Sequence, residues 1–531
     1  MYVLIADFFK EDILGGGEIV NDEIFSTLSD RAGAPTVKIH SHLVTLPFIE
    51  SHTGLNFIVG NFLNLSPASQ RRLRRERYVI YEHDHKYLKT RDPSVFPNLL
   101  APKEQLTNMA FYRDALAVVC QSKMHADVLA KNTHLRNIVN AGGNPWPEDH
   151  LQTIEEHLDV SKKGLCGIMD SPNQVKNTEG AIQFCKQQGY EYKLIPPGAH
   201  DTFIKELSEC DSFAFFPVVM ETMSRVIVEA KMLGCKIYTN GLIGATSEDW
   251  FSLKGQDLVD HTRGKRSEIA TLFENIFSPT NSSPYQDITV ILNAYRRPYN
   301  LDAQIKAIRE QTKPPKQIWV WVNDHEDLDG FDFSQLDADK VFRNDHNWKF
   351  YGRFAAALLA ETEHVAIFDD DTIPGSRWLE NCLSTMETHE GILGSAGVIL
   401  EGETYNPHQR CGWPTHNEET TQVDLVGHAW FFKREWLRYL WTEPPITWDN
   451  GEDMQFSYAA QKYGNINTYC PPHPADDKEL HGSILGNELG IDDKATSTNS
   501  SLSHQAFFSE RDYCVSSAVA RGWVLVKDQE K

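Results

Sequence analysis

Three consecutive aspartates follow a short apolar segment in the C-terminal half of the chain. Residues 364–368 (HVAIF) are rich in strand formers, and Asp369, Asp370 and Asp371 come directly after them. In open parallel sheets, ligands gather at the carboxyl ends of strands. Carboxylates at such an edge can bind a hard divalent cation, which in turn binds phosphate. An isolated acidic run is more often a solvated turn, but the preceding strand pattern favours a metal site here.

A second acidic motif, Gly451–Glu452–Asp453, opens a helical pattern farther along the chain. Carboxylates at a helix N-terminus are stabilised by the helix dipole, so a purely structural role as a cap is one interpretation. The other interpretation is general acid–base chemistry, which two carboxylates near a metal site could perform.

The N-terminal half contains a glycine run and a spaced pair of acids. Backbone amides in a loop such as residues 15–17 (GGG) can approach phosphate closely. Glu221 and Glu229 lie eight positions apart, and the second falls within a helix that leads to an apolar strand.

The elements that must position these residues alternate between short apolar runs and amphipathic stretches. This alternation predicts an α/β protein with parallel sheets wound with helices. We expect two such sheets in the N-terminal part, over residues 1–145 and 146–277. Residues 278–286 have the composition of a linker, with two prolines and several small polar residues. A C-terminal domain over 287–531 follows.

The C-terminal domain resembles nucleotide-diphosphate-sugar transferases of the GT-A fold. The segments that carry the resemblance are ITVILNAYRRP, IWVWVND and VAIFDDDTIP, within about residues 287–469. The inverting cellulose- and chitin-synthase-like enzymes are most similar, and there is some likeness to exostosin-type transferases. The resemblance implies Mn²⁺ or Mg²⁺ as cofactor and favours a UDP-sugar as donor.

The resemblance also implies roles for individual residues. One carboxylate of the GED motif deprotonates the acceptor hydroxyl, and we expect Asp453 to be this base and Glu452 to orient the acceptor. Asp369 and Asp371 would bind the metal and the diphosphate, and Asp370 the sugar or ribose. A late histidine, His481, is a candidate third metal ligand. The remaining candidates contact the donor: Asn293, Tyr295, Arg296, Asp324 and Arg353.

Two tryptophans near the GED motif, Trp430 and Trp448, could stack on sugar faces. Either could equally belong to the core, which is the better default for a single aromatic residue.

The N-terminal part resembles retaining GT-B transferases of the glycogen-synthase-like group, which are built from twin Rossmann-type domains. The resemblance rests on the spaced glutamates, the GGGE loop and the HD pair after YVIY. An arginine typical of the group is replaced by Asp170, so an inactive scaffold that binds an acceptor or a partner is an equal alternative. The implied second site comprises Gly16, Gly17, His83, Lys176, Glu221, Arg225 and Glu229.

Composition limits the classes of partner and compartment. The formal net charge of −23 opposes binding to nucleic acid or anionic lipid. Nine scattered cysteines without a paired motif suggest reduced thiols in a cytoplasmic protein. The first residues lack the pattern of a signal peptide and no apolar run is long enough for a membrane span, so we expect neither.

We therefore predict a metal-dependent hexosyl- or pentosyltransferase that acts on a glycan or another hydroxyl acceptor. If both modules are active, the chain adds two sugars in succession. The alternatives are a metal-dependent phosphohydrolase or nucleotidyltransferase, a non-catalytic nucleotide-sugar- or carbohydrate-binding protein, and a transferase acting on hydroxymethylated DNA bases.

Overall fold

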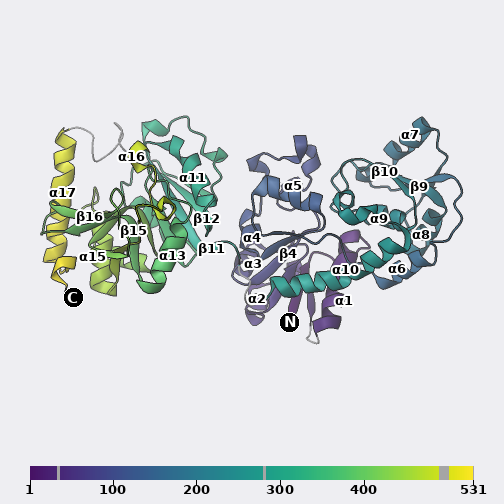
Figure 1. Cartoon of the computed structure of the whole chain (residues 1–531), viewed down its shortest axis with the longest axis horizontal. Helices are drawn as coiled ribbons and strands as arrows, with labels where there is room; N and C mark the ends of the chain where they lie inside the picture. The colour runs from purple at the N-terminus through teal and green to yellow at the C-terminus, as the bar shows by residue number, and fades with distance from the viewer. Residues whose placement is uncertain (33–35, 279–282, 490–500, 530–531) are drawn as a thin grey trace. The chain divides into compact units, whose positions relative to one another are not determined.

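The computed structural model describes residues 1–32, 36–278, 283–489 and 501–529. The chain divides into two compact units, Met1–Pro284 (unit 1) and Tyr285–Lys531 (unit 2) (Figure 1). The predicted linker 278–286 lies partly outside the described residues.

Unit 1 begins with a six-stranded sheet in the order β2-β1-β3-β4-β5-β6, and every neighbouring pair is parallel. Its central strands are buried along their length, as expected when helices cover both faces of a sheet. The strands are β1 (Tyr2–Ala6), β2 (Val37–His40), β3 (Asn56–Val59), β4 (Arg77–Tyr81), β5 (Ala117–Cys120) and β6 (Ile138–Asn140).

A second parallel sheet follows in unit 1, with the order β10-β9-β7-β8. Both sheets are of the Rossmann-like type, with strands alternating with helices. The strands are β7 (Leu165–Met169), β8 (Tyr192–Ile195), β9 (Cys210–Phe215) and β10 (Lys236–Thr239).

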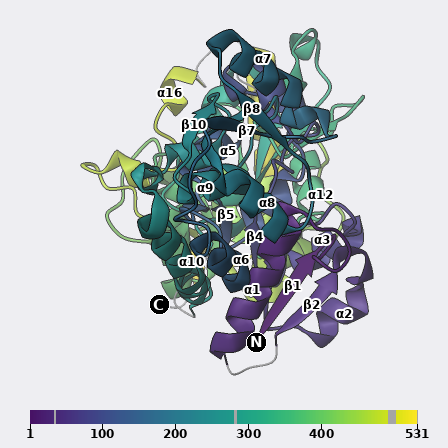
Figure 2. The same ribbon diagram turned by 90° about the vertical axis from the view of Figure 1, so that its right-hand side faces the viewer.

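Helix α10 (Gly255–Ile276) connects the cores of these two sheets. Leu258 and Val259 pack in the core of the second sheet, whereas Ile269 and Phe273 pack in that of the first, where α10 contacts α1 (Figure 2). The predicted second domain of the N-terminal part, over residues 146–277, therefore contains a helix that also packs in the core of the first sheet. The other helices are α1 (Gly16–Ala32), α2 (Leu46–Ser51), α3 (Pro67–Leu73), α4 (Met109–Asp114), α5 (Lys123–Thr133), α6 (Glu148–Glu155), α7 (Thr178–Gln188), α8 (His200–Ser208) and α9 (Arg225–Met232).

Unit 2 is built on one mixed sheet in the order β13-β12-β11-β14-β18-β15-β19-β17, with β16 paired to β15. The first four strands are parallel, and β18 then joins β14 antiparallel. This arrangement is a GT-A-type α/β domain. The strands are β11 (Gln286–Ala294), β12 (Pro315–Val322), β13 (Lys340–Arg343), β14 (His364–Phe368), β15 (Gly391–Leu400), β16 (His408–Gly412), β17 (Thr421–Val423), β18 (Leu425–Lys433) and β19 (Asn467–Cys470).

The helices of unit 2 pack on both faces of this sheet, and α17 lies alongside α15 (Figure 1). None of the described helices is both long and apolar enough to cross a membrane. The nine cysteines are buried free thiols. The helices are α11 (Leu301–Arg309), α12 (Gly352–Ala357), α13 (Trp378–Thr388), α14 (Leu437–Leu440), α15 (Glu452–Gly464), α16 (Gly486–Leu489) and α17 (Ser501–Ala520).

Candidate functional site

The aspartate run lies at the carboxyl end of β14, in the middle of the mixed sheet. Two buried amides fix its backbone. Gln304 donates to the carbonyls of Asp369 and Thr372 at 2.7 and 2.8 Å, and Asn300 donates to the carbonyl of Asp370 at 2.8 Å. These bonds use main-chain acceptors, so the carboxylates remain available for other contacts.

Arg297 provides a positive charge for this run. Its Nη1 donates to Asp370 Oδ1 at 2.9 Å and lies 3.8 Å from Asp371 Oδ2. Burial nevertheless raises the pKa of Asp370 to about 6. Burial also raises the pKa of Asp371, but contacts with His428 and Arg297 outweigh it and lower the pKa below its ordinary value. Asp370 and Asp371 thus differ in their affinity for a proton.

Among the described residues, Asp369, Asp371 and His428 form a group that could hold a metal ion. Their ligand atoms all lie within 4.8 Å of one another. The buried Nδ1 of His428 has no hydrogen-bond partner and lies 3.9 Å from Asp371 Oδ1. Two carboxylates and an imidazole suit a divalent cation such as Mn²⁺. The predicted third ligand, His481, lies outside this group, and its Nε2 contacts the carbonyl of Pro474 at 2.7 Å.

Arg353, at the start of α12, links the two acidic motifs. Its Nη1 contacts Asp369, and its Nη2 donates to Glu452 Oε1 at 3.1 Å. The guanidinium is buried and lies over the ring of Trp430, 4.7 Å from the centroid. Trp430 itself is only 2% exposed, so its face is not open to a sugar.

The GED carboxylates have different environments at the N-terminus of α15. Burial, together with the neighbouring charge of Asp453, raises the pKa of Glu452 to about 7. Asp453 Oδ2 accepts a hydrogen bond from Arg511 on α17 at 2.7 Å. Arg511 also donates to Asn450 at 3.2 Å, which ties the loop before α15 to the same guanidinium.

The predicted nucleoside contacts cluster at the carboxyl ends of β11 and β12. The parallel register pairs Asn293 with Trp321, so the residues that follow both strands reach the same edge of the sheet. The buried Oδ1 of Asn293 has no hydrogen-bond partner. Tyr295 packs edge-on against His325, 4.9 Å between ring centroids. Arg296 contacts Asp327 at 3.3 Å, and Asp324 is exposed.

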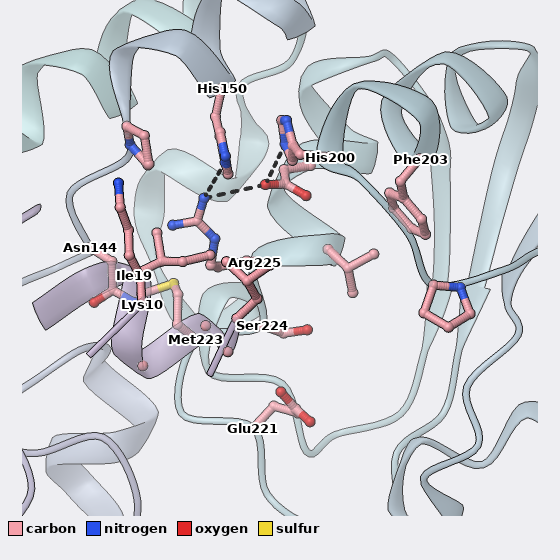
Figure 3. A pocket seen from close by; sticks show the side chains of 18 of the residues that line it. Lys10, Ile19, Asn144, His150, His200, Phe203, Glu221, Met223, Ser224 and Arg225 are labelled. Atoms are coloured by element: carbon pink, nitrogen blue, oxygen red, sulfur yellow. Dashed lines mark hydrogen bonds and ion pairs between the residues drawn. The ribbon is translucent and has the colours of Figure 1, made fainter. Parts of the chain in front are cut away.

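Unit 1 contains a separate cavity of about 680 Å³ (Figure 3). It lies between the residues of the glycine run at α1 and those around α6, α8 and α9. The Lys176 ammonium contacts Glu221 at 2.6 Å within it. The structure brings all the residues predicted for a second site to this cavity, namely Gly16, Gly17, His83, Lys176, Glu221, Arg225 and Glu229.

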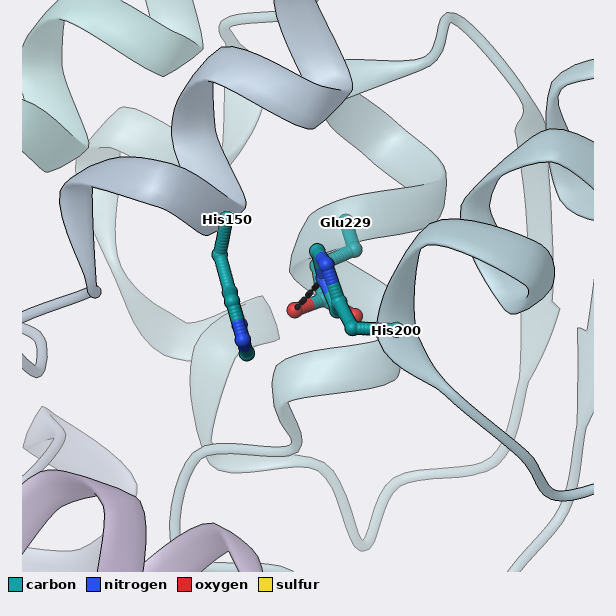
Figure 4. Close-up of side chains that lie close together, drawn as sticks. All are labelled: His150, His200 and Glu229. Atoms are coloured by element: carbon teal, nitrogen blue, oxygen red, sulfur yellow. Dashed lines mark hydrogen bonds and ion pairs between the residues drawn. The ribbon is translucent and has the colours of Figure 1, made fainter.

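A group of cationic and imidazole side chains lies at one end of this cavity. The rings of His150 and His200 stack at 3.6 Å beside Glu229 (Figure 4). Glu229 accepts hydrogen bonds from Trp146 at 3.2 Å and contacts His200 at 3.3 Å. Burial, with the charges of His200 and Arg225, lowers the pKa of His150 to about 4.

The same three side chains, His150, His200 and Glu229, are close enough to share a metal ion. However, the Arg225 guanidinium lies 3.3 Å from His150 Nδ1 and 3.5 Å from Glu229. Glu229 is the one carboxylate of this group, and its charge is already compensated by Arg225, so little negative charge is left for a metal ion. The buried Nη1 of Arg225 has no hydrogen-bond partner, so this end of the cavity is better suited to an anion.

Comparison with known families finds a match within unit 2. Residues 289–441 match the model of glycosyl transferase family 2. This part of unit 2 is therefore similar to glycosyl transferase family 2. The match begins in β11 and ends just after α14, so the matched region includes the aspartate run, Arg353 and His428. No curated protein matches the chain.

Solved structures show a more distant similarity. S. aureus TarS is 16% identical over 35% of this chain and 36% of its own, with a TM-score of 0.27. Anabaena HepE in complex with UDP and glucose is 14% identical over 53% of this chain and 96% of its own, with a TM-score of 0.31. A shorter TarS chain in complex with UDP-GlcNAc is 16% identical over 37% of this chain and 61% of its own, with a TM-score of 0.26. The chain thus spans about a third of the length of TarS.

Sequence reasoning missed several charged residues around the candidate site of unit 2. Arg297 follows the predicted Arg296 directly, and only the structure shows that it is Arg297 that contacts the aspartates. His428 reaches the site because β18 pairs antiparallel with β14, which places its carbonyl 3.0 Å from the Asp369 amide. Arg511 lies far along the chain, in a helix that carries no recognisable motif.

Proposed function

We propose that unit 2 transfers a sugar from a nucleotide-diphosphate donor to an acceptor hydroxyl. The observation that carries this proposal is the double contact of Arg353, which joins the Asp369 carboxylate to Glu452. A sugar transfer needs a group that stabilises the departing diphosphate and a base for the acceptor, placed on either side of one anomeric carbon. Arg353 brings the two acidic motifs that supply these groups to one place.

The donor diphosphate is proposed to lie against the carboxyl end of β14. Asp369, Asp371 and His428 would hold Mn²⁺ or Mg²⁺ there, and the bound cation would stabilise the negative charge on the departing diphosphate. Asn293, with its unpartnered buried oxygen, and Tyr295 are the side chains available for the nucleoside. A UDP-sugar is the donor that the family resemblance favours.

Asp453 is proposed as the general base. Its carboxylate would take the proton of the acceptor hydroxyl while the acceptor oxygen forms its bond to the anomeric carbon and the diphosphate departs from the opposite face. The configuration at that carbon would invert. Arg511 holds the carboxylate in position through the 2.7 Å hydrogen bond to Oδ2. Glu452 acts through Arg353, as a positioning residue.

The first test is donor hydrolysis by the full chain. UDP-, GDP-, ADP-, CMP- and dTDP-sugars are incubated with Mn²⁺, and the released nucleotide is measured. We expect slow release from one donor, abolished by EDTA and by the double substitution Asp369→Ala plus Asp371→Ala. Release that survives both treatments would contradict the assignment of the activity to unit 2.

A second candidate function concerns unit 1 alone. The cavity that gathers the predicted second-site residues is large enough for a nucleotide-sized ligand and has cationic groups at one end. We propose that it binds a second nucleotide sugar or an anionic sugar. Lys176 is already paired with Glu221, so the phosphate groups would be bound mainly by Arg225, Lys10 and the N-terminus of α1.

A further inference from the structure

A pair of buried cysteines lies at the end of the mixed sheet of unit 2. Cys411 is on β16 and Cys470 ends β19, and both strands pair with β15. A Cβ placed on Gly397 of β15 would lie 3.1 Å from the Cβ of Cys470 and 3.3 Å from that of Cys411. The two cysteine side chains therefore converge on the space that this glycine leaves free.

The sulfur of Cys470 lies against the chain of β16. A Cβ on Gly412, the residue after Cys411, would lie 2.5 Å from Cys470 Sγ, and Gly412 has a φ of 72°. Glycine at this position tolerates the positive φ and leaves room for the sulfur. The thiol of Cys470 also hydrogen-bonds to the Cys411 sulfur, so the two sulfurs are in contact.

The two thiols differ in acidity and in exposure. Hydrogen bonds from Cys470, from Thr421 and from the Gly412 amide outweigh burial and lower the pKa of Cys411 to about 7. Burial raises the pKa of Cys470, which therefore stays a thiol. The imidazole of His473, 3.8 Å from Cys470 Sγ, is neutral at pH 7, because burial lowers its pKa to about 4. Cys411 is 5% exposed and Cys470 is fully buried, so the more acidic thiol is also the more accessible one.

We propose that Cys411 and Cys470 are a redox-active pair that a peroxide converts to a disulfide. The Cys411 thiolate attacks one oxygen of hydrogen peroxide, the O–O bond breaks, and the departing hydroxide takes up a proton to become water. The Cys470 sulfur then attacks the sulfenic acid, so that the S–S bond forms and the S–O bond breaks. The hydroxyl leaves with the Cys470 proton as a second water. Two thiols are thus oxidised while one peroxide is reduced, and a thiol reductant such as dithiothreitol reverses the change.

Trp413 connects this pair to the candidate metal group. Its ring lies 4.2 Å from that of His428, and its amide donates to the Ser395 carbonyl at 2.8 Å. The two sulfurs must approach to about 2.05 Å in a disulfide, so we expect β16 and β19 to draw together and Trp413 to shift against His428. Loss of such support around a ligand weakens metal binding, and we expect the oxidised protein to bind Mn²⁺ about tenfold more weakly. This second part of the inference rests on the proposed function of unit 2.

The first experiment maps the thiols of the full chain. The reduced protein is treated with hydrogen peroxide, free thiols are blocked with N-ethylmaleimide in denaturant, and unreduced peptides are identified by mass spectrometry. We expect a Cys411–Cys470 linkage that dithiothreitol removes. Its rate of formation should rise with pH and level off above about 7, because the thiolate is the nucleophile. In Cys470→Ser, Cys411 should accumulate as a sulfenic acid that dimedone traps, whereas Cys411→Ser should form neither product.

Cys185→Ser is the matched control. Cys185 also hydrogen-bonds to a neighbouring cysteine, Cys166, but burial together with this bond raises its pKa to about 12, so it has almost no thiolate at neutral pH. This variant should form the Cys411–Cys470 linkage at the wild-type rate. A wild type that does not form the linkage, or that links Cys166 to Cys185 instead, would overturn the inference, whatever the variants do.

The second experiment measures Mn²⁺ affinity by calorimetric titration of the reduced and the oxidised wild type, after removal of the peroxide. The affinity should fall on oxidation and return after treatment with dithiothreitol. Equal affinity of the two forms would overturn the coupling to His428. Absence of Mn²⁺ binding by the reduced protein would count against the proposed metal site, whereas the thiol map alone decides whether the pair is redox-active.

Discussion

Glu452 is the residue whose protonation state should control the activity near neutral pH. Its raised pKa of about 7 means that the protonated form persists well above the ordinary range of a glutamate. Below about pH 7 the neutral carboxyl loses its charge interaction with Arg353, and above it the ion pair is complete. We therefore expect transfer to rise with pH through an inflection near 7.

The Glu452→Gln variant should lose this inflection and keep part of its activity at all pH values, because glutamine can still accept the Arg353 hydrogen bond.

Asp453→Asn provides the contrast. Loss of a general base should lower the rate of transfer by about 10²–10⁴-fold across the pH range, with donor affinity retained. Rate–pH profiles and donor titrations of both variants check this. If Glu452→Gln has the larger loss and Asp453→Asn is nearly active, the two roles are reversed.

At the scale of single residues, the sequence could predict what lies next to a motif. Asp369 and Asp371 follow a strand pattern, and Glu452 and Asp453 open a helix pattern, so local periodicity was enough to find them. It could not predict the partners that tertiary structure brings. Arg297 and Arg511 became visible only through their contacts with Asp370 and Asp453.

At the scale of elements, α12 and α15 are coupled by one guanidinium. Arg353 uses two nitrogens for two carboxylates on different elements, which an ammonium cannot reproduce in the same geometry. Arg353→Lys keeps the buried charge but should lose one of the two contacts. We expect transfer to fall about tenfold or more, with a smaller loss of thermal stability than in Arg353→Ala, where the buried carboxylate of Glu452 would lose its guanidinium partner.

Turnover and thermal unfolding of Arg353→Lys and Arg353→Ala are the measurements. Arg309→Lys is a suitable control. Arg309 also contacts two aspartates of unit 2, Asp337 and Asp339, and neither belongs to the two acidic motifs. Equal turnover of Arg353→Lys and the wild type would show that the double contact of Arg353 is not needed to position Glu452.

Elements with regular periodicity were predictable, and those that depend on pairing were not. The apolar run 364–368 coincides with β14, because a buried central strand has a strong local signal. Strand β18 carries His428 at φ 63°, and its position next to the aspartates depends on antiparallel pairing with β14. Nothing in the local sequence fixes that pairing, so the late histidine His481 was the candidate instead of His428.

At the scale of the whole molecule, the composition and the alternation of elements predicted an α/β protein with Rossmann-like sheets, as the structure has it. The sharing of α10 between two cores was not predictable, because its amphipathic pattern does not say which sheet each turn covers. The chain has two compact units and two separate candidate sites, so the activity of each must be tested with the other silenced.

The ligand of unit 1 can be tested in the full chain with Asp369→Ala plus Asp371→Ala and EDTA, which remove the proposed metal site of unit 2. Calorimetric titration with UDP should then reveal residual binding. Arg225→Gln and Lys10→Gln should each weaken it by about tenfold, because each removes one charge-assisted contact to phosphate. Lys254→Gln, an exposed lysine of unit 1 that does not line the cavity, should leave the affinity unchanged. Absence of residual binding, or binding that is insensitive to both cavity substitutions, would mean that unit 1 does not bind the nucleotide through this cavity.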